Sequence, residues 1–104
     1  MLNSLTSFDF ERRIDGSKYS AVLFFADHCG PSRALCRIFR ELSEELSCVD
    51  FFTVCVDNEE ELAERYNIDT MPSVMLLQDG RIISVIREVI GKRTLAEKIY
   101  DFYR

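Results

Sequence analysis

The chain has 104 residues, of which 47% are hydrophobic and 12% aromatic, and its formal net charge is −5. This length and composition predict one globular domain over residues 1–104 and argue against intrinsic disorder. The negative charge argues against non-specific binding to nucleic acid or anionic membranes, and no apolar run approaches the roughly 20 residues that span a bilayer.

Apolar patterning in the first half of the chain predicts a helix, a strand and a long helix. Residues 7–14 carry apolar side chains between charges, behind Thr6 or Ser7 as an N-cap, which predicts a short helix. Residues 20–26 form a continuous apolar run, typical of a strand covered on both faces. Residues 31–46 repeat apolar side chains at helical spacing, which predicts the long helix.

The second half predicts a strand, a helix, a hairpin and a closing helix. Residues 49–56 are a second apolar run, and glutamates open residues 58–66, where they suit the positive end of a helix. Residues 73–88 predict two strands joined by a tight turn at Asp79-Gly80. Residues 94–104 predict the closing helix. Its apolar face consists of Leu95, Ile99 and Phe102.

The order of these elements predicts an α/β fold with a central mixed sheet. We also expect a short strand at residues 2–5. Strands that alternate with helices imply parallel pairing, whereas the hairpin adds antiparallel strands. The continuous apolar strands imply helices on both faces of the sheet.

Cysteine usage indicates a reducing compartment. Cys29, Cys36, Cys48 and Cys55 lie mostly inside apolar segments, which favours free thiols over a disulfide scaffold. Their spacing lacks the close pairs of a zinc site and the one histidine is His28, so we expect neither a metal ion nor another cofactor. The N-terminal residues do not resemble a secretory signal. We therefore expect a soluble, cytoplasmic protein with no nucleic-acid or membrane partner.

The turn Cys29-Gly30-Pro31-Ser32 lies between a predicted strand and a predicted helix. A cysteine at a helix start faces unpaired backbone N–H groups and the positive end of the helix dipole, and both favour the thiolate. Pro31 suits the first helical turn, where its missing N–H costs nothing. The turn therefore indicates a nucleophilic Cys29, and the alternative is a buried cysteine that caps the helix without chemistry.

Two segments, residues 22–39 and 54–82, resemble the thioredoxin family. The first looks like the family's strand, redox turn and long helix, and the second matches its third strand, third helix, cis-proline loop and hairpin without gaps. The resemblance covers nearly the whole chain. It implies a thioredoxin-like fold and thiol–disulfide oxidoreductase activity on protein disulfides.

The same resemblance assigns roles to individual residues. It implies that Cys29 is the attacking nucleophile and that Met71-Pro72 is the family's cis-proline dipeptide, with Pro72 facing the sulfur. The backbone before Pro72 would pair with substrate like an added strand. The alternative for Pro72 is an ordinary strand-initiating proline. The implied turn and groove residues are Gly30, Pro31, His28, Thr70, Met71 and Glu88.

Several positions depart from the family pattern. Ser32 stands where the family has its resolving cysteine. Leu23 and Thr53 replace a buried aspartate and the lysine that usually partners it, a coherent joint loss because one alone would leave an uncompensated charge. Phe25 and His28 replace two tryptophans, and the chain has no tryptophan at all.

No other cysteine is expected to take the resolving role. Cys36 lies seven residues after Cys29, about 10 Å along a helix, whereas a disulfide needs Cα atoms within roughly 7 Å. We expect Cys36, Cys48 and Cys55 to pack in the core, which leaves Cys29 as the only reactive thiol.

Three readings of the site remain open. In the first, the protein is a monothiol oxidoreductase, and glutathione or the substrate supplies the second thiol for isomerisation or glutathione-assisted reduction. In the second, Ser32 is an engineered replacement in an ordinary protein-disulfide reductase. In the third, the chain is a redox-inactive binding module. The first reading predicts long-lived mixed disulfides, including disulfide-linked homodimers through Cys29.

Charged side chains near the turn allow two interpretations each. His28 either assists the Cys29 thiolate and its proton, or is a solvent-exposed replacement for a tryptophan. Arg33, Arg37 and Arg40 form a helical stripe that either attracts an acidic peptide or glutathione, or pairs with nearby glutamates, and the number of such glutamates favours pairing. They are Glu41, Glu44 and Glu45.

Overall fold

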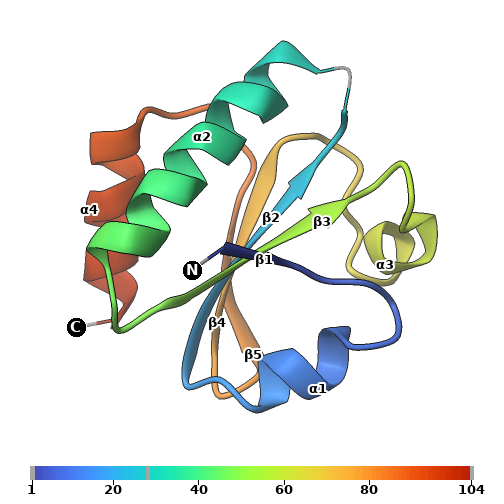
Figure 1. Cartoon of the computed structure of the whole chain (residues 1–104), viewed down its shortest axis with the longest axis horizontal. Helices are drawn as coiled ribbons and strands as arrows, with labels where there is room; N and C mark the ends of the chain where they lie inside the picture. The colour runs from blue at the N-terminus through green and yellow to red at the C-terminus, as the bar shows by residue number, and fades with distance from the viewer. Residues whose placement is uncertain (1, 28, 104) are drawn as a thin grey trace.

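A five-stranded sheet with two helices on each face forms the fold (Figure 1). The computed structural model describes residues 2–27 and 29–103. The elements are, in chain order, β1 (Leu2–Ser4), α1 (Phe10–Asp15), β2 (Tyr19–Phe25), α2 (Gly30–Glu45), β3 (Asp50–Cys55), α3 (Glu60–Arg65), β4 (Ser73–Gln78), β5 (Arg81–Ile86) and α4 (Lys92–Tyr103).

The sheet is mixed, as the sequence predicts. Its strand order is β1-β3-β2-β4-β5, with β3 parallel to both β1 and β2. The hairpin strands run antiparallel, β4 to β2 and β5 to β4. The hairpin turn requires left-handed backbone at Asp79 (φ 52°) and Gly80 (φ 81°), which is why an Asp-Gly pair is found there.

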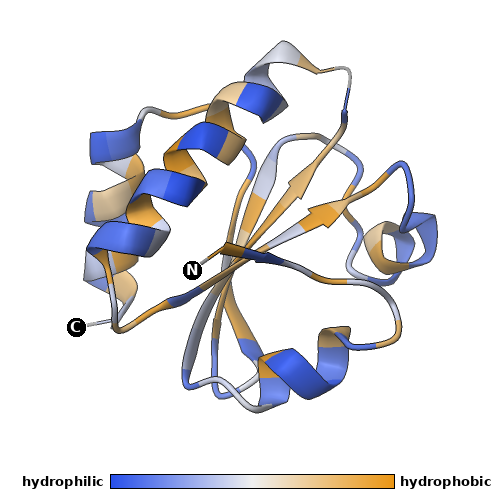
Figure 2. Cartoon of the chain, viewed as in Figure 1, coloured by the Kyte–Doolittle hydropathy of each residue, from blue (hydrophilic) through white to orange (hydrophobic). Residues whose placement is uncertain are grey.

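The central strand β2 contributes side chains to two hydrophobic cores. Val22 and Phe24 pack with α1 and α3 on one face, and Ala21 and Leu23 pack with α2 and α4 on the other. All four side chains are fully buried. Figure 2 shows apolar strands between helices that turn polar faces outward. Coverage of both faces explains the uninterrupted apolar sequence of this strand.

The first helix begins later than the sequence predicts. Neither Thr6 nor Ser7 is its N-cap. The N-cap is Asp9, whose carboxylate accepts a hydrogen bond from the Thr6 N–H at 2.8 Å. This hydrogen bond lowers the pKa of Asp9 and closes a turn before the helix, which leaves Phe8 98% exposed.

The last helix uses a different aromatic residue from the one predicted. Leu95 and Ile99 are buried, but Phe102 is 43% exposed and Tyr103 completes the inner face. The Tyr103 hydroxyl lies 2.6 Å from the Ser20 carbonyl oxygen and accepts the Leu77 N–H at 3.0 Å. Tyr103 therefore ties α4 to the backbones of β2 and β4. Its burial raises its pKa.

We expect Tyr103→Phe to lower the free energy of unfolding by about 1–3 kcal/mol, because backbone groups of Ser20 and Leu77 lose a partner inside the protein. Urea denaturation followed by circular dichroism measures this change. Tyr100→Phe is the matched control, since Tyr100 is 62% exposed and should tolerate loss of its hydroxyl. Equal stability of the two variants would contradict a structural role for the Tyr103 hydroxyl.

Candidate active site

Cys29 lies in the connection between the central strand β2 and the long helix α2. It is the N-cap of α2, with extended backbone angles (φ −103°, ψ 117°), and Pro31 occupies the first helical turn. The Cys29 carbonyl accepts the first helical hydrogen bond from the Arg33 N–H at 3.0 Å. The half-buried side chain thus projects from a helix N-terminus, as the sequence predicts.

Ser32 is buried beneath this turn and acts on the neighbouring sulfur. Its side chain is fully buried, and its hydroxyl oxygen accepts the Ala26 N–H at 3.3 Å. The Ser32 hydroxyl and, secondarily, the Ser32 backbone N–H form hydrogen bonds that lower the pKa of Cys29. The residue at the resolving position therefore favours the Cys29 thiolate, although a hydroxyl cannot carry out thiol exchange.

The loop before β4 supplies the opposite side of the site. The Met71–Pro72 peptide bond is cis, as expected, and Pro72 is buried. The Cys29 thiol donates a weak hydrogen bond to the Met71 carbonyl oxygen at 3.9 Å. The Ser73 hydroxyl anchors this loop by donating to the Thr70 carbonyl at 2.6 Å. Segments more than forty residues apart thus meet at one sulfur.

The remaining predicted turn and groove residues are mostly exposed. Thr70 and Glu88 are exposed, Gly30 and Pro31 are exposed in the first turn of α2, and Met71 is half-buried. Glu88 follows β5 and makes no hydrogen bond or ion pair within the described segments. His28 lies outside the described residues.

The position of the missing ion pair is filled by uncharged side chains. Leu23 on β2 and Thr53 on β3 are register partners, so the two replaced positions are adjacent across the strands. Leu23 is fully buried in the core, and the Thr53 hydroxyl lies 3.3 Å from the Ser4 hydroxyl. No carboxylate is available at this position to accept a proton from a neighbouring thiol.

The four cysteines are all free, and the prediction that three of them are packed in the core is wrong for one. Cys36 and Cys55 are half-buried, and burial raises the pKa of both thiols. Cys48 is exposed because α2 ends before it and the chain turns toward β3. Cys29 differs from Cys36 and Cys55 in having a lowered pKa.

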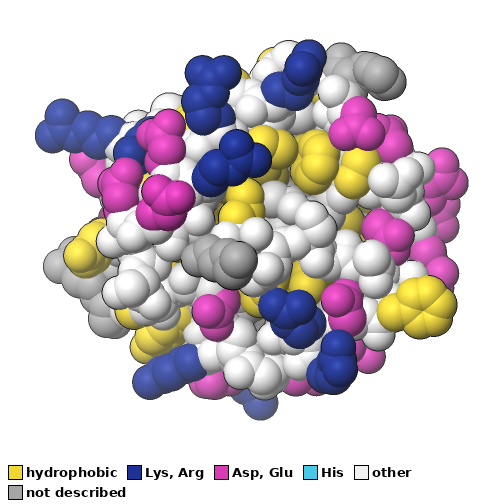
Figure 3. Space-filling view, viewed as in Figure 1, with side chains coloured by type: hydrophobic (Ala, Val, Ile, Leu, Met, Phe, Trp, Pro, Cys, Tyr) yellow, Lys and Arg dark blue, Asp and Glu magenta, His cyan; other side chains and the backbone are white. Residues whose placement is uncertain are grey.

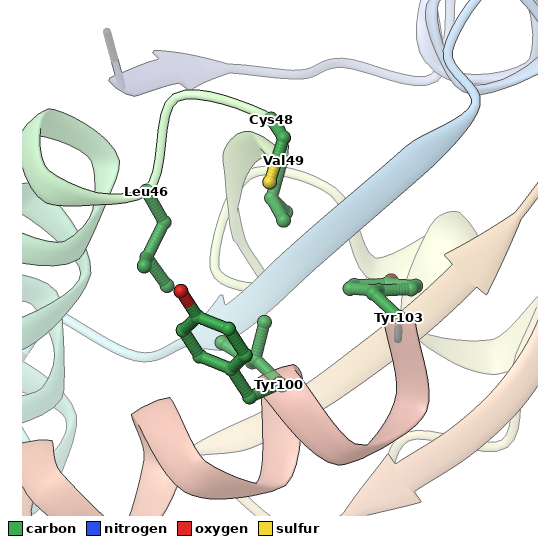
Figure 4. A pocket seen from close by; sticks show the side chains of 6 residues that line it. Leu46, Cys48, Val49, Tyr100 and Tyr103 are labelled. Atoms are coloured by element: carbon green, nitrogen blue, oxygen red, sulfur yellow. The ribbon is translucent and has the colours of Figure 1, made fainter.

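Cys48 borders a separate apolar cavity of about 80 Å³. Figure 4 shows Cys48 and Val49 on the loop before β3, and Tyr100 and Tyr103 on α4, around the same space. This cavity lies at the C-terminal end of α2, whereas Cys29 caps the N-terminal end. It therefore does not belong to the site at Cys29.

Three potential metal ligands meet beside the site, which the sequence does not reveal because one follows β2 and the other two lie at the end of β3. The ligand atoms of Asp27, Cys55 and Asp57 lie within 4.8 Å of one another. The Asp57 carboxylate accepts the Asp27 N–H at 2.9 Å and the Cys55 thiol at 4.0 Å. These hydrogen bonds account for the cluster without an ion.

Comparison with known proteins gives one consistent family. The family model described as Thioredoxin matches residues 1–101. A thioredoxin-like protein of Fusarium culmorum is 33% identical over 110 residues, covering 95% of this chain and 91% of the relative. A thioredoxin H-type of Fagopyrum esculentum is 32% identical over 84 residues, covering 81% of this chain and 70% of the relative.

A third relative is much longer than this chain. The peptide-N(4)-(N-acetyl-beta-glucosaminyl)asparagine amidase of Caenorhabditis elegans is 32% identical over 91 residues. The match covers 88% of this chain but only 15% of the amidase. The chain therefore resembles one part of that protein.

Solved structures agree with the fold. Plasmodium falciparum thioredoxin superimposes with a TM-score of 0.89 at 25% identity, over 96% of this chain and 98% of that one. A chain from a study of thiol resolution in yeast mitochondrial 1-Cys peroxiredoxin via glutathione/thioredoxin systems gives a TM-score of 0.88 at 26% identity, over 96% and 94%. Among the described residues, no helix combines the length and apolar character needed to cross a membrane.

Proposed function

The chain belongs to the thioredoxin family, and we propose that it performs thiol–disulfide exchange through one nucleophilic cysteine, Cys29. The observation that carries this proposal is the position of Cys29 at the N-terminus of α2, beside the Met71 carbonyl, with a buried serine at the resolving position. Ser32 lowers the pKa of Cys29, but its hydroxyl cannot resolve a disulfide. Family membership supports the redox chemistry. The chain's own residues suggest that it proceeds with one sulfur.

In the first step, the Cys29 thiolate attacks one sulfur of a substrate disulfide. A new disulfide joins Cys29 to the substrate while the original sulfur–sulfur bond breaks, and the other substrate sulfur leaves as a thiolate. No external oxidant or reductant is needed. The Met71 carbonyl, which accepts the Cys29 thiol in the free protein, lies where a substrate backbone could pair as an added strand.

A second thiol must then release the enzyme. Cys36 lies within the continuous helix α2, about 10 Å along the axis from Cys29, so it cannot resolve the mixed disulfide without unwinding the helix. We propose that glutathione or a second thiol of the substrate attacks Cys29 instead. This chemistry supports disulfide isomerisation and removal of glutathione from proteins.

We propose further that residues 1–104 act as one domain in the cytoplasm. Four free cysteines are consistent with a reducing compartment. The proposed partners are disulfide-bonded proteins and glutathione, together with a second copy of this chain linked through Cys29. The negative net charge opposes a nucleic-acid partner.

Glutathione disulfide should form a mixed disulfide at Cys29 of the wild type, and this adduct should persist until a thiol is added. Mass spectrometry of proteolytic peptides identifies the modified cysteine. Cys29→Ser should lose this adduct and the disulfide-linked dimer, a drop of about tenfold or more, since the other thiols are less thiolate-prone or remote from the groove.

Cys48→Ser is the matched control, because Cys48 is also accessible. It should keep both the Cys29 adduct and the dimer. Dimers that survive in Cys29→Ser and vanish in Cys48→Ser would move the reactive thiol to the far end of α2. A Cys29 that forms no adduct while the protein still binds a partner would favour the binding-module reading.

A further inference from the structure

Three exposed arginines follow Cys29 along α2, and we call Arg33, Arg37 and Arg40 the arginine surface. The four-residue steps from Cys29 to Arg33 and Arg37 put these residues on one side of the helix. At 1.5 Å per residue, Arg33 lies about 6 Å and Arg37 about 12 Å along the axis from Cys29. Figure 3 shows Lys and Arg side chains gathered over the upper part of α2.

The structure overturns the expectation that nearby glutamates neutralise these arginines. Lys92, at the start of α4, pairs with Glu41 at 3.0 Å and also with Glu45. No ion pair within residues 2–27 and 29–103 involves any member of the arginine surface. Because α4 packs beside α2, its Lys92 pairs with Glu41 and Glu45, and the guanidinium groups stay available to a partner.

A hollow beside the arginine surface fits a polypeptide better than a small anion. Arg40 borders a cavity of about 250 Å³ that also contains Phe25 and Cys36. Its other lining residues are Leu2, Ser4 and Thr53. The Arg40 guanidinium can hold a carboxylate while a neighbouring side chain of the same peptide enters this hollow, whose lining is mixed polar and apolar.

Acidic side chains border the Met71 side of the site, across from the arginine surface. Asp57, Glu60 and Glu64 border a cavity of about 280 Å³ that also includes Met71. Asp27 lies beside Asp57. Cys29 therefore sits between a basic flank on α2 and an acidic flank near α3, and a bound chain meets different charges on its two sides.

We propose that the arginine surface selects disulfide-bonded polypeptides with acidic residues next to the reacting cysteine, an inference that rests on the proposed exchange at Cys29. The net charge of −5 repels an acidic partner as a whole, so attraction must come from local contacts. Arginine binds carboxylates with two parallel hydrogen bonds. Arg33 and Arg37 lie close enough to Cys29 for such contacts to position a substrate sulfur.

The test uses peptides whose single cysteine carries a 2-thiopyridyl group. Each has two glutamates or two lysines, on the N-terminal or the C-terminal side of the cysteine. The Cys29 thiolate attacks the peptide sulfur, the bond to the thiopyridyl sulfur breaks, and 2-thiopyridone leaves with the electron pair. Mass spectrometry measures the adduct at Cys29 separately from that at Cys48, and glutathione disulfide is compared in parallel.

We expect a glutamate peptide to react faster than its lysine counterpart at low ionic strength. The double variant Arg33→Glu with Arg37→Glu should lower the glutamate-to-lysine rate ratio about tenfold or more. In the wild type, roughly 0.5 M salt should bring this ratio closer to one. Arg12→Glu with Arg81→Glu is the charge-matched control. Arg12 lies on α1 and Arg81 begins β5 at the hairpin end of the sheet, remote from Cys29, so the ratio should hold within about twofold.

Each remaining outcome counts against the inference in a distinguishable way. Equal rates for glutamate and lysine peptides, or an equal change in the control, overturn the arginine surface as a selector and leave exchange at Cys29 intact. A defect confined to glutathione disulfide assigns the arginines to free glutathione. A Cys29 that reacts with no peptide overturns the proposed function and this inference together.

Discussion

Ser32→Cys should accelerate release of a reduced peptide chain from its mixed disulfide with Cys29 by about 100-fold or more in a single turnover without added thiol, because an adjacent thiol attacks with a high effective molarity. The substitution is close to isosteric, and Ser32 is buried in the first turn of α2, three residues after Cys29. A sulfur in its place should reach the mixed disulfide. Chromatography of the released chain measures the rate, and mass spectrometry identifies the disulfide between Cys29 and the introduced cysteine.

Ser32→Ala is the control for this gain, since it changes the same buried position without adding a thiol. It should release the chain as slowly as the wild type. Leu23 provides no carboxylate to deprotonate the new cysteine. The rate at which Ser32→Cys releases the chain should therefore still rise with pH. Wild-type release as fast as that of Ser32→Cys would mean that another resolving group exists.

Ser32→Ala should also slow alkylation of Cys29 at pH 7 by roughly threefold or more, because it removes a charge-assisted hydrogen bond to the thiolate. The hydroxyl lowers the pKa of Cys29. At pH values below the ordinary pKa of a cysteine, a larger fraction of Cys29 should therefore be thiolate in the wild type than in Ser32→Ala. Loss of the hydroxyl should move the midpoint of the pH–rate profile upward. The Ser32 backbone N–H remains and should preserve part of the effect.

Iodoacetamide labelling, quantified separately for each cysteine by mass spectrometry, measures the change in Cys29 reactivity. The other three cysteines serve as internal controls. Cys48 is exposed and lies at the other end of α2, so its labelling rate should be the same in both proteins. Cys36 and Cys55 should label slowly, because burial raises their pKa values and limits access. An unchanged Cys29 profile in Ser32→Ala would show that the hydroxyl does not stabilise the thiolate.

The sequence predicted the fold where hydrophobic pattern and chain order leave little choice. Two continuous apolar runs predicted strands covered on both faces, and Asp79-Gly80 marked the hairpin. Helix ends were less certain, because the caps depend on contacts that the pattern does not encode. Asp9 caps α1 through a turn made with Thr6, and Tyr103 replaces Phe102 because its hydroxyl reaches backbone groups of two strands.

At the site, local sequence determined Cys29, its place before a helix, the serine in the resolving position and, through the family resemblance, the cis bond before Pro72. Only the tertiary structure decided which side chains surround them. Packing of α4 against α2 gives Glu41 and Glu45 to Lys92, and the end of α2 exposes Cys48. Ser32 could be recognised as a missing thiol from sequence, but its support of the thiolate depends on the folded turn, because hydrogen bonds require positions that linear spacing does not specify.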